Sequence, residues 1–74
     1  MSPELRGVKP ARAVSALKKA GFMEIRRSGS HALLRKEGCP LLIIPMHLKE
    51  LKIGMLRDIL KKAEISIEEF LKLL

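Results

Sequence analysis

Apolar residues near the start of the chain follow a helical period. They recur at three- and four-residue steps, at Ala13, Val14, Leu17, Ala20 and Gly21. This spacing puts them on one face of a helix and leaves the basic residues for the other side. Pro10 suits the first position of that helix, Gly21 suits a left-handed cap at its end, and Phe22 can pack back on the last turn.

Between residues 22 and 44 the apolar positions fit three short strands. Turn signals separate them, at Ser28 and Gly29 and again at residues 37–40, and the strands predicted are Phe22–Arg27, His31–Lys36 and Leu41–Ile44. The adjacent Leu33 and Leu34 leave the facing of the middle strand, and so of His31, undecided. The third segment is continuously apolar and is compatible with a buried strand.

A second helix is predicted after a polar connection at residues 46–52. Its apolar stripe consists of Met55, Leu56, Ile59, Leu60 and Ala63. Asp58 and Lys62 are spaced for a weak ion pair on its polar side. Ser66 and Glu69 form a capping box that predicts a last short helix, with Ile65 and Phe70 at the positions of a hydrophobic staple.

These elements predict an α+β fold in the order α-β-β-β-α, followed by a short α-helix. A three-stranded antiparallel sheet with helices on one face is the simplest arrangement, and it leaves the other face free for a ligand. Residues 1–8 lack periodicity and are predicted to be a flexible arm. Residues 9–74 are predicted to form a single domain.

The net charge indicates which kind of partner the protein binds. The 74-residue chain has a formal net charge of +7 and a sequence pI of about 10.1, so it should attract polyanions, among which nucleic acid is the natural partner. Two phenylalanines without tryptophan or tyrosine offer little for base stacking. No apolar run reaches the roughly 20 residues that span a bilayer. One cysteine and no visible signal peptide favour a cytoplasmic location.

The candidate functional side chains lie in one hinge between the first two predicted strands. It combines two guanidinium groups, two hydroxyls, a glycine and a histidine, in the run Arg26, Arg27, Ser28, Gly29, Ser30 and His31. Arginine binds phosphate through two parallel hydrogen bonds, and histidine transfers protons near neutral pH. Strand alternation predicts that only one of the two arginines faces a given ligand.

Four motifs in this order and spacing resemble the HicA toxins. They are Gly21-Phe22, Gly29-Ser30-His31, Ile44-Pro45-Met46-His47 and the run from Gly54 to Leu60. The resemblance extends from about Val14 to the C-terminus. Two positions depart from the family pattern: Glu64 stands where a helix-ending glycine is usual, and Met55 where threonine or serine is common.

The resemblance implies a fold similar to the double-stranded RNA-binding domain. It also implies an endoribonuclease of the mRNA interferase type, which cuts messenger RNA without a ribosome, and a HicB-like antitoxin as the protein partner. The histidine of the Gly-Ser-His motif is catalytic in the family, and His31 occupies that position. Neither departure from the pattern touches this proposed site.

The residues also suggest a mechanism of their own. No pair of carboxylates stands near a histidine at metal-ligand spacing, which favours catalysis without a metal or other cofactor. His31 would take the proton of an RNA 2′-hydroxyl while Arg26 and Arg27 stabilise charge on the phosphate, and Ser30 would orient the phosphate or the imidazole. The proton donor is open between His47, Lys49 and a water molecule. The residues expected to contact RNA are Arg26, Arg27, Ser30, His47 and Lys49.

Two further expectations concern partners. The alternative function is a non-catalytic RNA-binding module, which would have the same basic charge and the same sheet as a nuclease. Replacement of His31 distinguishes the two, because only a nuclease depends on that side chain. A toxin needs an inhibitor, and we expect an acidic or polar antitoxin surface over residues 26–31. No membrane or small-molecule cofactor is expected as a partner.

Overall fold

The computed structural model describes residues 5–74 and confirms the predicted α+β order. The elements are α1 (Pro10–Lys19), β1 (Met23–Ser28), β2 (His31–Arg35), β3 (Leu42–Pro45), α2 (Ile53–Ala63) and α3 (Ile67–Leu73). No helix within residues 5–74 has the length and apolar character needed to cross a bilayer.

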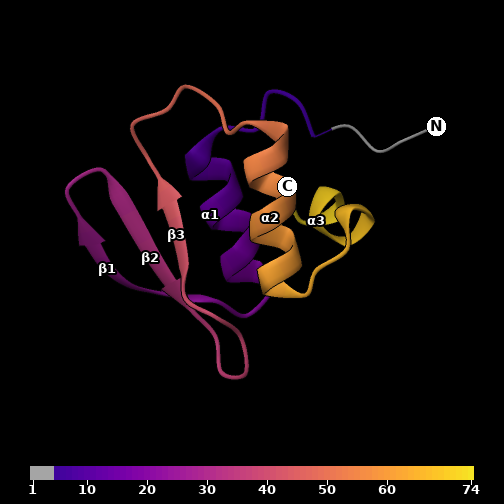
Figure 1. Cartoon of the computed structure of the whole chain (residues 1–74). Coiled ribbons are helices and arrows are strands. Elements are labelled where there is room, and N and C mark those ends of the chain that lie inside the picture. The colour runs from indigo at the N-terminus through magenta and orange to yellow at the C-terminus, as the bar shows by residue number, and fades with distance from the viewer. Residues whose placement is uncertain (1–4) are drawn as a thin grey trace.

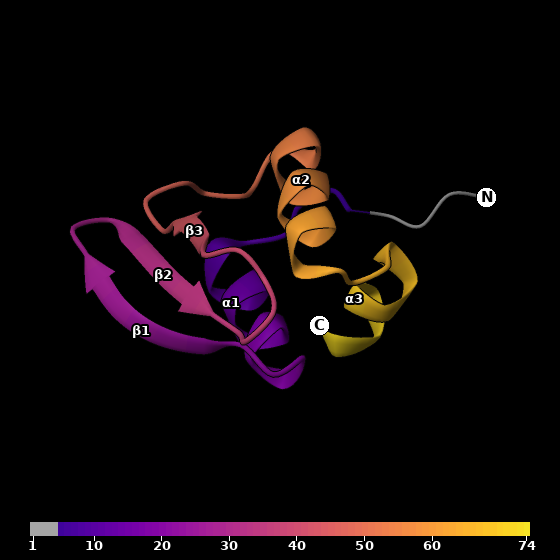
Figure 2. The ribbon, with the colours of Figure 1, turned by 60° about the horizontal axis from the view of Figure 1, so that its bottom comes forward.

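All three helices lie on the same side of the sheet (Figures 1 and 2). The antiparallel strands are ordered β1-β2-β3, and α1 and α2 pack against β3. Helix α3 packs on α1 and α2 rather than on the sheet. One face of the sheet is therefore covered by helices, as predicted, and we call the opposite side the open face.

Side chains alternate between the core and the open face along β2 and β3. Leu34 and Ile44 are fully buried, whereas Leu33 is only half-buried and Ile43 is 54% exposed. The apolar run at residues 41–44 is thus not buried on both sides, contrary to what continuous hydrophobicity suggested. Because helices cover one face only, every second residue of the run faces solvent.

The β1–β2 hairpin extends beyond the helical layer (Figure 1). None of the six residues of β1 is buried, since helices pack against β3 and not against this outer strand. The register shifts between Glu24 and Arg26, which makes Ile25 an extra residue in β1. This hairpin carries the Arg26–His31 hinge into solvent.

The first helix ends as the sequence predicts. Gly21 adopts a φ of +107°, the amide of Gly21 donates to the Lys18 carbonyl, and the amide of Phe22 donates to the Leu17 carbonyl. These two bonds form a Schellman motif. The ammonium of Lys36 adds a third bond, to the Ala20 carbonyl at 2.9 Å.

Helix α2 ends with the same pair of bonds, but a glutamate occupies the left-handed position. Glu64 has a φ of +58°, and the amides of Glu64 and Ile65 donate to the carbonyls of Lys61 and Leu60. The departure from the family's glycine therefore changes the residue and not the turn. The Ser66 N-cap of the predicted capping box is confirmed, because the Ser66 hydroxyl accepts from the Glu69 amide at 3.0 Å.

The predicted flexible arm over residues 1–8 is wrong for residues 5–8. Leu5 and Val8 are 2% and 5% exposed and belong to the hydrophobic core, and the Val8 carbonyl accepts from the Leu51 amide at 2.8 Å. Two isolated apolar residues have no periodicity that could reveal such docking. Residues 1–4, the rest of the predicted arm, lie outside the described residues.

The two helix ends predict stability changes of opposite sign. Replacing Glu64→Gly should stabilise the fold by about 0.5–1 kcal/mol, because relief of left-handed strain outweighs the greater chain entropy of glycine. Gly21→Ala should destabilise it by about 1 kcal/mol or more, because alanine is strained at positive φ and its Cβ would lie 3.2 Å from Cε of Lys36. Urea unfolding midpoints that move in the same direction for both variants would contradict this account.

Candidate functional site

His31 lies on the open face, which settles the facing that the sequence left undecided. It is the first residue of β2 and is exposed, opposite Ser28 of β1 and Pro45 of β3. Ala32, the next residue, points into the core and is fully buried. The imidazole is therefore accessible from solvent, while the backbone of His31 is held by strands on both sides.

His47 lies beside His31 although sixteen positions separate them in the chain. Their ring centroids are 6.3 Å apart with an interplanar angle of 76°. One backbone contact explains this proximity: the carbonyl of Ser30 accepts a hydrogen bond from the amide of Met46. These two residues directly precede the two histidines, so the bond positions both rings.

Arg26 shares a shallow hollow with His31 on the open face. The hollow is lined by Arg26, Ser28, His31, Leu33 and Ile43. Arg26 is opposite Leu33 in the antiparallel register, and opposing residues lie on the same face of a sheet. The guanidinium, one hydroxyl and the imidazole thus line one concave surface.

Arg27 is engaged elsewhere, which confirms that alternation separates the two arginines. It is opposite Ala32, a residue of the covered face, and its Nε donates to Oε2 of Glu24 at 2.8 Å. Lys18 contacts the other carboxylate oxygen at 3.3 Å. The hydrogen bond from Arg27, with Lys18 as a further contributor, lowers the pKa of Glu24. Any stability from this pair is present above the ordinary glutamate pKa and lost as pH falls through the lowered value.

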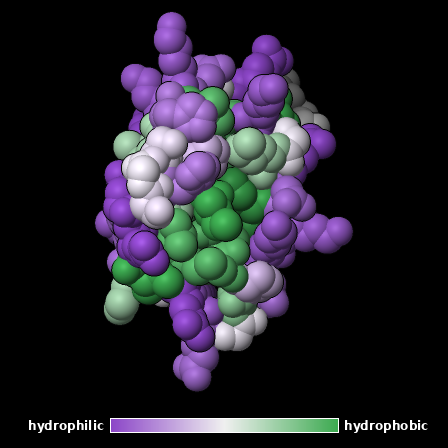
Figure 3. All heavy atoms as spheres, turned by 60° about the vertical axis from the view of Figure 1, so that its left-hand side comes forward, coloured by the Kyte–Doolittle hydropathy of each residue, from purple (hydrophilic) through white to green (hydrophobic). Residues whose placement is uncertain are grey.

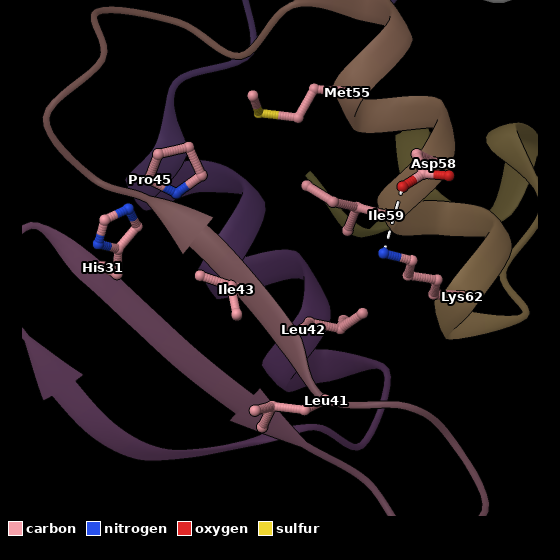
Figure 4. A pocket seen from close by; sticks show the side chains of 9 residues that line it. All are labelled: His31, Leu41, Leu42, Ile43, Pro45, Met55, Asp58, Ile59 and Lys62. Atoms are coloured by element: carbon pink, nitrogen blue, oxygen red, sulfur yellow. Dashed lines mark ion pairs between the residues drawn. The ribbon is translucent and has the colours of Figure 1, made fainter.

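A groove leads from His31 over β3 to helix α2 (Figure 4). Its volume is about 340 Å³, with apolar side chains along most of its length and His31, Asp58 and Lys62 as its polar residues. Asp58 and Lys62 form the predicted ion pair, at 3.3 Å. Figure 3 shows a hydrophobic patch framed by hydrophilic side chains on the side of the molecule that carries the sheet.

The remaining predicted residues have different surroundings. Ser30 is half-buried at the hairpin turn, and the contact it makes to Met46 uses its backbone carbonyl. Lys49 is exposed in the connection between β3 and α2, and it is not among the residues that line the hollow or the groove. Within residues 5–74, no three His, Cys, Asp or Glu side chains lie close enough together to hold a metal ion.

Sequence reasoning missed the apolar lining of the site. Leu33 and Ile43 line the hollow, and Met55, which is 37% exposed, lines the groove rather than the core. Strand alternation was the available signal for Leu33 and Ile43, once Leu34 and Ile44 are assigned to the core. The contribution of Asp58 and Lys62 follows from the packing of α2 on β3, which residue spacing does not specify.

Comparison with known proteins identifies a family. The family model described as "HicA toxin of bacterial toxin-antitoxin" matches residues 11–65, which is more than half of the chain and includes every predicted site residue. No curated protein matches the chain. The matched region contains the sheet, both helices that pack on it and the pair of histidines. The chain belongs to the HicA toxin family.

Proposed function

We propose that this protein is a toxin endoribonuclease that cleaves messenger RNA by acid–base chemistry between two histidines. The observation that carries the proposal is the pairing of His31 with His47 on an exposed face, next to Arg26. The net charge of +7 favours RNA as the ligand. Messenger RNA as substrate implies action in the cytoplasm.

The reaction needs no nucleophile from the protein. His31 removes the proton from an RNA 2′-hydroxyl, whose oxygen then attacks the adjacent phosphorus. The bond from the 2′-oxygen to phosphorus forms while the bond from phosphorus to the 5′-oxygen breaks. His47 gives its proton to that 5′-oxygen. The products are a 2′,3′-cyclic phosphate and a 5′-hydroxyl.

The spacing of the two rings supports these roles. A base and an acid must each come within about 2.6–3.2 Å of the atom that they serve. Centroids 6.3 Å apart leave the rings out of direct hydrogen bonding but close enough to reach the same phosphodiester. Arg26, which lines the same hollow as His31, stabilises the negative charge that builds on the phosphoryl oxygens.

We also propose that a HicB-like antitoxin inhibits the toxin by covering the open face. Charge alone suggested an acidic or polar antitoxin surface over residues 26–31, but the open face that the antitoxin would cover also carries exposed apolar residues. Leu33, Leu41 and Ile43 surround the approach to His31 and are at least partly exposed. A complementary partner presents apolar side chains at the centre of its contact and acidic ones at the rim.

Replacing His31→Ala should lower the rate of RNA cleavage by about 10²- to 10⁴-fold, the usual cost of losing a general base. Affinity for RNA should change little, because the basic groups that bind the backbone remain. A cleavage assay and a binding titration on the same RNA, each with and without chelator, separate the two effects. RNA binding without any cleavage by the unmodified protein would support a non-catalytic RNA-binding module instead. Unchanged cleavage by His31→Ala would exclude His31 as the base, and cleavage abolished by chelator would overturn the metal-independent route.

The same assay tests His47 through its dependence on pH. With one base and one acid the rate passes through a maximum as pH rises. His47→Ala should remove the decline on the alkaline side, because that decline reports loss of the acid's proton. If His47→Ala cleaves at the normal rate across pH, the donor is another group, with Lys49 or water next.

The two arginines provide a matched pair of variants. Arg26→Gln should lower the cleavage rate about tenfold or more, less than the roughly 10²- to 10³-fold typical of a well-shielded oxyanion donor, because the hollow is open to water. Arg27→Gln should leave the rate nearly unchanged, since this side chain bonds Glu24. Equal losses in both variants would mean that both arginines serve RNA only through their charge.

Antitoxin binding should depend on the apolar residues of the open face. Ile43→Asp should speed dissociation of the cognate antitoxin by about tenfold or more, because it puts a charge into the centre of the contact. Ser15→Asp on α1, exposed on the helical side, is the matched control. Surface plasmon resonance measures both. Equal dissociation rates for Ile43→Asp and the unmodified toxin would contradict occlusion of this face.

A further inference from the structure

The proposed mechanism leaves the groove between β3 and α2 unused. Acid–base chemistry employs its His31 end only, whereas the groove continues over Leu41 and Ile43 to the ion pair of Asp58 and Lys62 (Figure 4). A substrate held at His31 therefore lies next to an apolar groove. Helix α2 forms one side of this groove and carries a carboxylate and an ammonium.

The ion pair on the helical wall is available to a ligand. Its side chains are 63% and 53% exposed, so solvent already weakens their attraction. A pair four residues apart on a helix surface contributes little to stability. Exchanging one partner for a ligand therefore costs little free energy. The two side chains thus offer one acceptor group and one donor group at neighbouring positions.

The apolar part of the groove suits a flat, unstacked ring. Leu41 and Ile43 are about half exposed, and Met55 lines the groove from α2 with 37% of its surface exposed. Single-stranded RNA is recognised by bases that leave the stack and present their Watson–Crick edges. A phosphodiester at His31 joins two nucleotides, and the base of either one is adjacent to the groove because His31 itself lines the groove.

We propose that this groove binds a base next to the cleaved phosphodiester and that Asp58 and Lys62 make guanine the preferred base. The inference rests on the proposed nuclease function and adds its sequence preference. Guanine has two adjacent donors, N1–H and the N2 amino group, which match the two oxygens of a carboxylate, and its O6 accepts from an ammonium. Adenine and cytosine turn a ring-nitrogen lone pair toward that carboxylate, and uracil has a single donor.

The test compares four RNA oligonucleotides that differ only at one base flanking the cleaved bond, in two sets, one for each side. The unmodified protein should cleave the guanine substrate of one set at least about tenfold faster than the others. Asp58→Asn should reduce that preference to about threefold or less, because an amide cannot accept from both donors.

Lys61→Gln is the matched control, because Lys61 is exposed on the same helix and does not line the groove. The preference should persist in it. Equal cleavage of all four bases by the unmodified protein, or a guanine preference that Asp58→Asn retains, would overturn the inference. So would Asp58→Asn weakening antitoxin binding while leaving the base preference intact, since the groove would then serve the protein partner.

A second measurement separates this inference from the nuclease function. The same oligonucleotides with a 2′-deoxy sugar at the reacting nucleotide cannot be cleaved, and their affinities report base recognition alone. Guanine preference in binding without cleavage of the ordinary RNA would refute the nuclease and retain the groove. Cleavage with equal affinity for all four bases would do the reverse.

Discussion

One-sided burial of the sheet is the constraint on which the rest of this molecule depends. A chain of 74 residues has little material for a core, and helices α1 and α2 cover a single face of the sheet. Leu34 and Ile44 are buried against them, so their neighbours Leu33 and Ile43 must face solvent. That alternation brings His31 and Arg26 to the same exposed face, with apolar residues around them.

The site is built from the backbone more than from side-chain contacts. The bond between the Ser30 carbonyl and the Met46 amide joins the hairpin turn to the end of β3, and each histidine directly follows one of its two residues. The neighbouring pairs of the register, such as Ala32 with Ile44, extend the same ladder into the core. A change in core packing would therefore reach the histidine spacing through the register of β2 and β3.

Most of the fold follows from local signals, and the site only in part. Period, caps and turns predicted each helix and strand within residues 5–74 because each signal lies within a few residues, as with Gly21 or the Ser66 N-cap. The burial of Leu5 and Val8 was not predicted, because their partners lie far along the chain. The facing of His31 and its proximity to His47 depend on strand register, which a run such as Leu33-Leu34 does not reveal. Asp58 and Lys62 were predicted as an ion pair, but their position beside the site depends on tertiary packing.

The central claim is that the two histidines move protons between the 2′-hydroxyl and the 5′-oxygen of RNA. The most direct measurement is the mass of the upstream RNA fragment immediately after cleavage by the purified toxin. A fragment ending in a 2′,3′-cyclic phosphate, with a 5′-hydroxyl on the downstream fragment, is the predicted result. An upstream 3′-hydroxyl paired with a downstream 5′-phosphate would contradict it, because those ends require attack by water rather than by the RNA itself.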